Sequence, residues 1–302
     1  MVAPHVSVVL PAHNEREVIA GAIDEVFAAL AAAGHAAEVI VVDDGSTDGT
    51  DAAVEALIAQ RPTLRLIRLA RNFGKESALA AGLDAAQGAY VALLDADLQD
   101  PPQEMVAMLA TAERGHDVVY GVRRSRRSGW LRWLGYRVFY RLLRLVSDLP
   151  MPLDSGDFSV LSRRAVDALN RLPERNRFLR GLRSWVGFRQ CGHLYDRPAR
   201  RAGATKYSLR SLWNLAVLGF LSCGRRPLAA AFFVGLAVVL AGLVAAVVGA
   251  AAVLVAVLVL GGVQLVAVGI LGAYLARVLD QVEGRPCYLV ERTVNCAAPA
   301  PR

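Results

Sequence analysis

The chain has 302 residues, a formal net charge of +7 at neutral pH and a hydrophobic content of 55%. This length allows one large or two modest domains with an ample core, and the hydrophobic content excludes an ordinary soluble protein. The N-terminus has neither a basic segment nor a cleavage site, so we do not expect a secretion signal there. The cysteines lack metal-type spacing, and we expect reduced thiols at Cys191, Cys223, Cys287 and Cys296.

Short apolar runs alternate with helical patterns in the first part of the chain. We expect buried strands at residues 6–10, 38–42, 64–69, 89–94 and 117–121. Helical spacing runs from Glu15 to about Ala33; a second helix follows the loop at 43–50 and ends at about Gln60, and the segment 71–76 opens a third. Strands that alternate with helices of this length predict an open, mostly parallel α/β sheet. Beyond these, we expect a strand after an acidic turn at 154–157, a helix over 176–186 and an extended segment over 189–195.

An acidic, glycine-containing loop over residues 43–50 follows the second predicted strand. Ligands of open α/β sheets bind at the carboxyl ends of the strands, so this loop is a candidate nucleotide site. The same residue types also suit a helix N-cap followed by a polar turn. The loop alone leaves both interpretations open.

Two carboxylates and an amide follow the apolar run Val91-Ala92-Leu93-Leu94, at Asp95, Asp97 and Gln99. On an extended segment this spacing points all three side chains the same way, so we expect their oxygens to converge beyond the strand. Hard oxygen ligands suit Mg²⁺ or Mn²⁺, commonly shared with the phosphates of a substrate. A turn in which the aspartates cap backbone groups explains the isolated motif about as well.

Two basic segments flank the remaining motifs. Eight arginines lie between Arg123 and Arg144, interleaved with aromatic residues, and this pattern predicts a basic amphipathic helix at about 128–147 on a membrane surface. Nucleic-acid binding is the competing interpretation, disfavoured because an apolar segment further on already accounts for the charge. The second segment, 197–206, contains Arg200 and Lys206 and suits either a phosphate or lipid headgroups.

The residues from 227 to 276 contain no Asp, Glu, Lys or Arg. They match two membrane spans of about 20–25 residues each, at about 227–249 and 253–276. Arginines flank both outer ends, so the positive-inside rule predicts a hairpin with both ends in the cytoplasm. The expected domains are therefore a cytoplasmic α/β domain over 1–205, a juxtamembrane interfacial helix over 206–226, the hairpin over 227–276 and a cytoplasmic tail over 277–302. We expect a short strand in that tail to join a sheet edge, with a neighbouring subunit as one option.

Seven motifs carry a resemblance to a known family. Residues 8–15 (VVLPAHNE), 42–48 (VDDGSTD), 72–76 (NFGKE) and 94–102 (LDADLQDPP) resemble family 2 glycosyltransferases with the GT-A fold. Residues 154–158 (DSGDF), 177–181 (RFLRG) and 202–207 (AGATKY) are similar to its polyprenyl-phosphate branch, which includes dolichol-phosphate mannose synthases and bactoprenol glucosyltransferases. A single such motif is weak evidence, whereas seven in the right order with a terminal hairpin are strong.

The resemblance implies a role for each matching residue. It implies that the donor nucleoside is cradled by Pro11, His13, Glu15, Val42 and Asp44. Further donor contacts are implied at Lys75, Asp95 and Ala96, and divalent-metal ligands at Asp97 and Gln99, with Asp95 as a third. It implies cations facing the diphosphate and the lipid phosphate at Arg123, Arg200 and Lys206. The implied catalytic residues are Asp157, as base, and Asp97. Two positions depart from the pattern, because Ser159 replaces a common arginine and Thr205 replaces the usual serine.

The implied activity is an inverting transfer of a sugar from a nucleotide-sugar to a polyprenyl phosphate such as undecaprenyl phosphate. The expected place is the cytoplasmic face of a bacterial inner membrane. UDP-glucose is the favoured donor, and GDP-mannose and modified UDP-pentoses stay open. A phosphate acceptor is already largely ionised near neutral pH, since its second pKa is about 6. An orienting role for Asp157 is therefore as plausible as a role as base.

Two other functions compete with this one. A processive polysaccharide synthase would carry a Gln-x-x-Arg-Trp motif and more spans than the chain has. A non-catalytic scaffold or flippase partner would not need the acidic and basic residues that the motifs retain. The expected partners are the donor, the lipid acceptor and membrane lipids, without nucleic acid. The expected assembly is a homo-oligomer, with a tetramer as one option.

Overall fold

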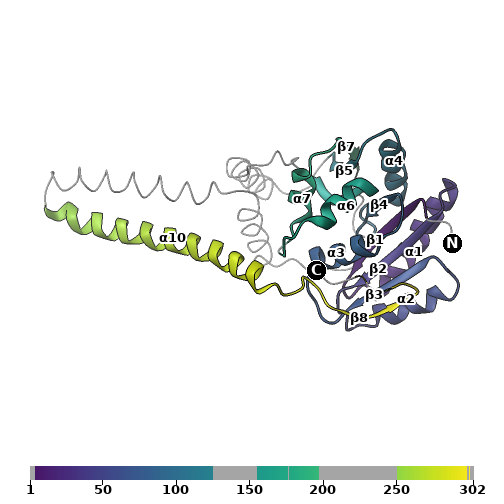
Figure 1. Ribbon diagram of the computed structural model, residues 1–302, viewed down its shortest axis with the longest axis horizontal. Helices are drawn as coiled ribbons and strands as arrows, with labels where there is room; N and C mark the ends of the chain where they lie inside the picture. The colour runs from purple at the N-terminus through teal and green to yellow at the C-terminus, as the bar shows by residue number, and fades with distance from the viewer. Residues whose placement is uncertain (1–3, 125–154, 176, 197–249, 298, 300–302) are drawn as a thin grey trace. The chain divides into compact units, whose positions relative to one another are not determined.

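The computed structural model describes residues 4–124, 155–175, 177–196, 250–297 and 299 (Figure 1). The chain divides into two compact units. The first contains residues 1–128, 152–206 and 286–302, and the second contains residues 129–151 and 207–285. The predicted interfacial helices at 128–147 and 206–226, and the predicted span at 227–249, lie outside the described residues.

The first unit is built on an eight-stranded sheet in the order β7-β5-β6-β4-β1-β2-β3-β8 (Figure 1). The strands are β1 (Val6–Ala12), β2 (Ala37–Asp43), β3 (Leu64–Leu69), β4 (Tyr90–Leu93), β5 (Val118–Arg123), β6 (Ser155–Ser162), β7 (Gln190–Tyr195) and β8 (Val290–Val294). Strands β4, β1, β2 and β3 are mutually parallel, and β7 is parallel to β5. Strand β6 is antiparallel to β4 and β5, and β8 is antiparallel to β3. The predicted mostly parallel α/β sheet is confirmed.

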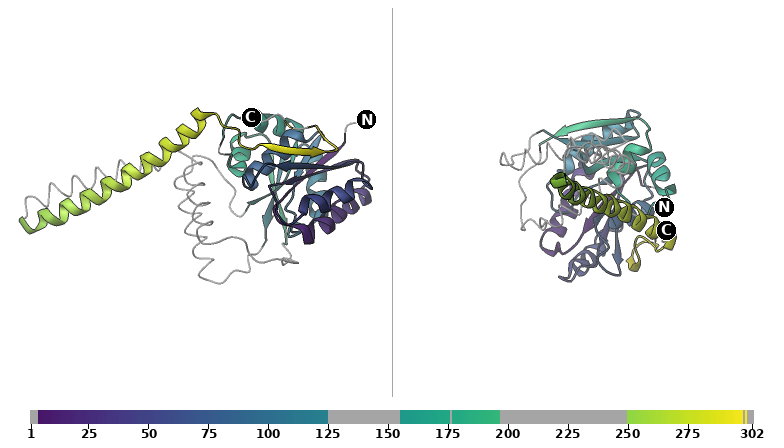
Figure 2. Two further views of the ribbon diagram at one scale, coloured as in Figure 1. Left: turned by 90° about the horizontal axis from the view of Figure 1, so that it is seen from below. Right: turned by 90° about the vertical axis from the view of Figure 1, so that its left-hand side faces the viewer.

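The tail strand β8 lies along β3 of its own chain, at one edge of the sheet (Figure 2). Tyr288, just before it, is fully buried, and its hydroxyl donates to Asp84 Oδ2 at 2.9 Å. Arg292 Nη2 lies 2.7 Å from Asp51 Oδ2. The tail therefore gives no argument for a neighbouring subunit. The expected homo-oligomer stays a prediction, which a mass measurement in mild detergent would test.

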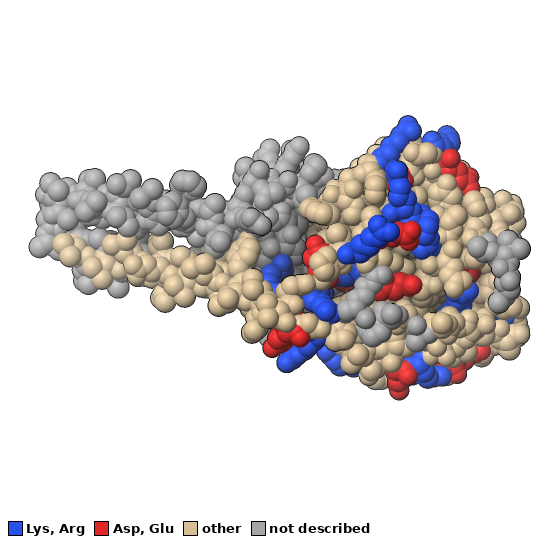
Figure 3. All heavy atoms as spheres, viewed as in Figure 1, with Lys and Arg blue, Asp and Glu red and all other residues tan. Residues whose placement is uncertain are grey.

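The described part of the second unit contains α10 (Ala250–Glu283), a single continuous helix. Its stretch Leu260–Glu283 is long and apolar enough to cross a membrane by length and composition, and Figure 3 shows that charged side chains are absent along most of the described helix. The predicted span at 253–276 lies inside this helix. The helix continues beyond Ala276, where the sequence predicted the span to end, because neither glycine nor proline occurs between Arg277 and Glu283.

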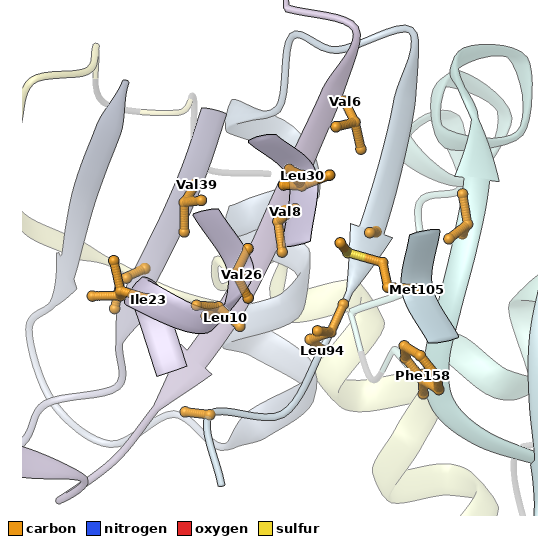
Figure 4. Packing of buried hydrophobic residues seen from close by; sticks show 14 of the residues in the cluster. Val6, Val8, Leu10, Ile23, Val26, Leu30, Val39, Leu94, Met105 and Phe158 are labelled. Atoms are coloured by element: carbon orange, nitrogen blue, oxygen red, sulfur yellow. The ribbon is translucent and has the colours of Figure 1, made fainter. Parts of the chain in front are cut away.

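Helices cover both faces of the sheet in the first unit. One face packs against α1 (Arg16–Ala32), α2 (Thr50–Ile58) and α4 (Pro102–Glu113), and the other against α3 (Lys75–Ala85), α6 (Arg163–Arg171) and α7 (Leu179–Trp185). Successive side chains of β1 point to opposite faces of the sheet, as strand geometry requires. Val8 and Leu10 pack with the first set of helices (Figure 4), whereas Val9 packs with the second.

Strand β1 and helices α4 and α6 differ from the sequence prediction. Strand β1 does not end before Pro11 but continues to Ala12. Leu94 N donates to Val9 O, so the alternation of the ladder turns Pro11 to that same side, where β4 has already ended and no donor is needed. Helices α4 and α6 were not predicted. Helix α6 is nine residues long and begins after Ser162, whose hydroxyl accepts a hydrogen bond from Ala165 N.

Candidate functional site

The predicted site residues meet at one edge of the sheet. Strands β1, β2 and β4 are parallel, so their carboxyl ends share this edge. Strand β6 begins at the same edge because it runs antiparallel to β4, with Leu93 paired to Ser159. Two residues beyond that pair, Asp95 follows β4 and Asp157 lies in β6. The topology therefore brings the two carboxylates towards each other.

The loops after β1 and β2 are held together by side chain to backbone hydrogen bonds. His13 Nδ1 lies 2.9 Å from Asp44 O, and Glu15 N donates to Thr50 Oγ1 at 3.0 Å. Asn14 has a positive φ of 54°, and its Oδ1 accepts from Thr47 N at 2.9 Å. Pro11 and Val42 are paired in the β1–β2 ladder. The five residues that the resemblance assigned to the nucleoside are thus brought together.

Asp44 joins this pair of loops to the start of α3. Its two carboxylate oxygens accept from Phe73 N at 2.7 Å and Gly74 N at 2.9 Å. Burial raises the pKa of Asp44, and the two backbone hydrogen bonds oppose that rise. Gly45 has a φ of +64°, and a Cβ there would collide with the backbone of Arg71 and Asn72. Glycine is required here because the loop after β2 approaches the backbone after β3 so closely.

The Asp95–Asp100 segment is a turn, so the extended geometry predicted from its spacing is wrong. Leu98 has a φ of 55°, and Gln99 N donates to Asp97 Oδ1 at 3.1 Å. This is the capped turn that was the alternative interpretation, because a short acidic side chain competes for nearby backbone donors. Ala96 is buried in the core and anchors the turn.

Oxygen atoms alone make up the predicted metal-ligand set, and all three residues are partly exposed. This donor chemistry fits a hard divalent cation such as Mg²⁺ or Mn²⁺. Asp95 Oδ1 lies 2.5 Å from Lys75 Nζ, and Asp97 Oδ1 accepts the hydrogen bond from Gln99 N. Asp97 and Gln99 are the two ligands that the resemblance implies, with Asp95 as a third.

Lys75 and Arg180 hold the Asp157 carboxylate from two sides. Lys75 Nζ bridges Asp157 Oδ2, at 2.7 Å, and Asp95 Oδ1. Arg180 Nε donates to Asp157 Oδ1 at 2.5 Å, and its Nη2 donates to Oδ2 at 3.1 Å. Burial alone would raise the pKa of Asp157, but Lys75 and then Arg180 hold that pKa well below its ordinary value. The same carboxylates raise the pKa of Lys75 against the opposing effect of burial.

Arg183 and Arg123 add positive charge beside Asp157. Arg183 Nη2 donates to Gly156 O at 3.3 Å, and burial lowers the pKa of this guanidinium to about 10, so it stays charged at neutral pH. Arg123 ends β5 and lies against Gly156, since a Cβ added there would be 3.3 Å from its Nη2. This concentration of cations suits an anionic substrate group. The other two predicted phosphate contacts, Arg200 and Lys206, lie outside the described residues.

Three residues around Asp157 received no role from the sequence. They are Arg180, Arg183 and Glu76, whose Oε2 accepts a hydrogen bond from Leu179 N next to Arg180. Two of them lie in motifs that carried the resemblance, at 72–76 and 177–181. The available signal was the i, i+3 spacing of Arg180 and Arg183, which places two cations on one face of α7. The carboxylate partner of Arg180, Asp157, is 23 positions away in the chain, so no local pattern identifies it.

Comparisons with known proteins agree with this geometry. The family model described as Glycosyl transferase family 2 matches residues 7–169. An uncharacterized glycosyltransferase of Synechocystis is 38% identical over 298 residues, which cover 94% of each chain. A prophage-derived bactoprenol glucosyl transferase of Shigella flexneri is 35% identical over 302 residues, covering 95% of this chain and 98% of the relative. The crystal structure of a mycobacterial protein, with a TM-score of 0.50 and 22% identity, covers 73% of this chain and 75% of its own and has a similar fold.

Proposed function

Because the chain belongs to glycosyl transferase family 2, we propose that it transfers a sugar from a nucleotide-sugar to a polyprenyl phosphate, with UDP-glucose as the favoured donor. The observation that carries this proposal is the length of the match to proteins named bactoprenol glucosyl transferase, which covers 95% of the chain. That match extends well beyond the 7–169 region common to the family. It includes the basic loop and the apolar segment, which a lipid acceptor would need.

The donor binds in this proposal at the carboxyl edge of the sheet. Its nucleoside lies between the loops after β1 and β2, where Pro11, His13 and Asp44 are held in place. Its diphosphate lies at the turn after β4. Asp97 and Gln99 would hold a Mg²⁺ or Mn²⁺ ion there, which as a Lewis acid would stabilise the negative charge of the departing nucleoside diphosphate.

Asp157 acts in this proposal as a fixed carboxylate and not as an obligatory base. Its pKa is held well below the ordinary value by Lys75 and Arg180, so it is a poor proton acceptor near neutral pH. The acceptor phosphate does not need deprotonation, since most of it is dianionic above its second pKa of about 6. Asp157 would instead hold the cations in position to align the phosphate for in-line attack, which inverts the anomeric centre.

We also propose that α10 is the second half of a membrane hairpin. Strand β8 follows α10 in the chain and pairs with β3, which precedes it. Both ends of the membrane segment must therefore lie on one side of the bilayer, so a spanning α10 requires a second crossing. The uncharged stretch at 227–249 supplies it. The positive-inside rule places the first unit in the cytoplasm of a bacterial cell.

The decisive test is transfer of labelled sugar into an organic-extractable lipid by purified full-length protein. A panel of UDP-glucose, GDP-mannose and UDP-pentose donors is offered with undecaprenyl phosphate, with and without EDTA. We expect transfer from UDP-glucose, loss with EDTA and recovery with excess Mn²⁺ or Mg²⁺. The Asp97→Ala variant should be inactive yet fold and enter the membrane normally. Absence of lipid-linked product from every donor would contradict the proposed activity, and full activity of Asp97→Ala would contradict the metal assignment.

A further inference from the structure

Glu76 is the second residue of α3 and connects that helix to α7. Its Oε2 accepts a hydrogen bond from Leu179 N at 3.0 Å, across 103 positions of sequence. Its neighbour Lys75 reaches Asp95 and Asp157. The first turn of α3 therefore contacts the turn after β4, the carboxylate of β6 and the start of α7.

The start of α7 depends on an acceptor from outside the helix. The first N–H groups of any helix have no partner within it. Phe178, at the N-cap of α7, provides no side-chain hydrogen bond. Glu76 provides the acceptor for Leu179, the first residue of α7, and the next residue, Arg180, donates two hydrogen bonds to Asp157.

We propose that Glu76 is a positioning residue, which fixes the start of α7 so that Arg180 holds the Asp157 carboxylate in its working orientation. This inference rests on the proposed function for the meaning of that orientation. The bond needs only an acceptor oxygen, which a neutral carboxyl group or an amide also provides. The charge of Glu76 is therefore not required, and glutamine should replace it.

The first test compares Glu76→Ala with Glu76→Gln in the transfer assay, with Glu113→Ala as a matched control. Glu113 pairs with His5 and lies at the far end of α4 from the turn after β4. We expect Glu76→Ala to lower kcat about tenfold through misplacement of Arg180, with donor KM little changed. Glu76→Gln and Glu113→Ala should stay close to wild type. Equal losses in Glu76→Gln and Glu76→Ala, or no loss in either, would overturn the proposal.

The second test is a double-mutant cycle between Glu76→Ala and Arg180→Ala. If Glu76 acts through Arg180, the double variant should be no slower than Arg180→Ala alone, because coupled residues are not additive. Losses that multiply would overturn the proposal, since they would show that Glu76 acts independently of Arg180. The same cycle on Tm tests the coupling without any activity. If the wild type makes no lipid-linked product, the proposed function fails, but the Tm values still test the contact. Non-additive Tm shifts would support coupling between Glu76 and Arg180, and additive shifts would contradict it.

Discussion

At the scale of single residues, the Asp157 site shows charge outweighing desolvation. Burial of the carboxylate would raise its pKa, yet Lys75 and Arg180 lower it well below the ordinary value. Glu76 lies beside the same cations and has its pKa raised to about 7, by burial and then by the Asp157 charge. The pKa values of these two neighbouring carboxyl groups thus shift in opposite directions, which keeps Asp157 ionised and makes Glu76 easier to protonate.

Asp157→Asn should lower the transfer rate by about 100-fold through loss of cation positioning, equally across pH 6–9. The folded carboxylate is already ionised throughout this range, so pH should not modulate the loss. Rates of wild type and variant measured at several pH values check this expectation. Asp167→Asn, at an exposed residue paired with Arg163, is the control. Recovery of the variant at high pH would instead indicate that Asp157 takes a proton.

Glu76→Gln should change how stability depends on pH. The pKa of Glu76 is raised from 4.5 to about 7 in the folded protein, so the folded state binds this proton more tightly than the unfolded state. The contribution of Glu76 to the free energy of unfolding therefore falls as the pH rises from 4.5 to about 7, and above that pH it levels off. The Tm difference between variant and wild type should grow in favour of the variant across that window. Parallel Tm curves would show that Glu76 does not titrate there.

Local pattern identified the strand ends at this site but not the contacts between them. Asp44 and Asp157 could be placed because each belongs to a recognisable motif next to a predicted strand. Glu76 and Arg180 could not, since their partners, Leu179 and Asp157, are distant in sequence. The segment after β4 was predicted to be extended and is a turn. Side-chain spacing does not reveal the local hydrogen bond from Gln99 N to Asp97 that accompanies the turn.

At the scale of elements, α3 is placed by a close approach to β1. A Cβ on Gly82 would collide with the methyl groups of Val9, a β-branched side chain with little freedom at χ1. This contact sets how closely α3 packs on the sheet. It therefore sets the positions of Lys75 and Glu76, the first two residues of that helix. Sequence pattern predicted the helix without revealing this contact, which depends on the packing of the sheet.

Gly82→Ala should destabilise the protein by about 1–3 kcal/mol through overpacking. Gly21→Ala is the matched control, because it also lies inside a helix but has no atom within 4 Å of an added Cβ. Relief of the entropy cost of glycine should make that variant more stable by about 0.5–1 kcal/mol. Urea unfolding of the two variants checks the difference in sign. Equal effects would mean that α3 moves away from β1 without cost.

The tail strand is a second element whose partner the sequence could not name. Tyr288→Ala should cost about 3–5 kcal/mol, because a fully buried ring is lost. Tyr288→Phe should cost about 1 kcal/mol, because only the hydrogen bond to Asp84 is lost. Thermal unfolding of the full chain in detergent measures both. A negligible effect of Tyr288→Ala would contradict docking of the tail on its own sheet.

At the scale of the whole molecule, chain topology constrains the membrane arrangement more tightly than hydropathy does. The composition predicted two spans, and the described residues contain one candidate, Leu260–Glu283. Pairing of β8 with β3 requires an even number of membrane crossings between these two strands, because residues before and after α10 share one sheet. No hydropathy profile contains that condition, since it follows from a contact between residues 66–69 and 290–294.

Single-cysteine labelling in intact bacterial cells tests this parity directly, in a chain whose native cysteines are replaced by serine. Asp196→Cys and Arg285→Cys report on exposed positions before and after the membrane segment, and Ala251→Cys reports on the predicted turn between the spans. A membrane-impermeant maleimide should label only Ala251→Cys in intact cells and all three after permeabilisation. Labelling of Arg285→Cys but not Asp196→Cys in intact cells would require an odd number of crossings. That result is incompatible with the β3–β8 pairing, because the two strands would then lie on opposite sides of the bilayer.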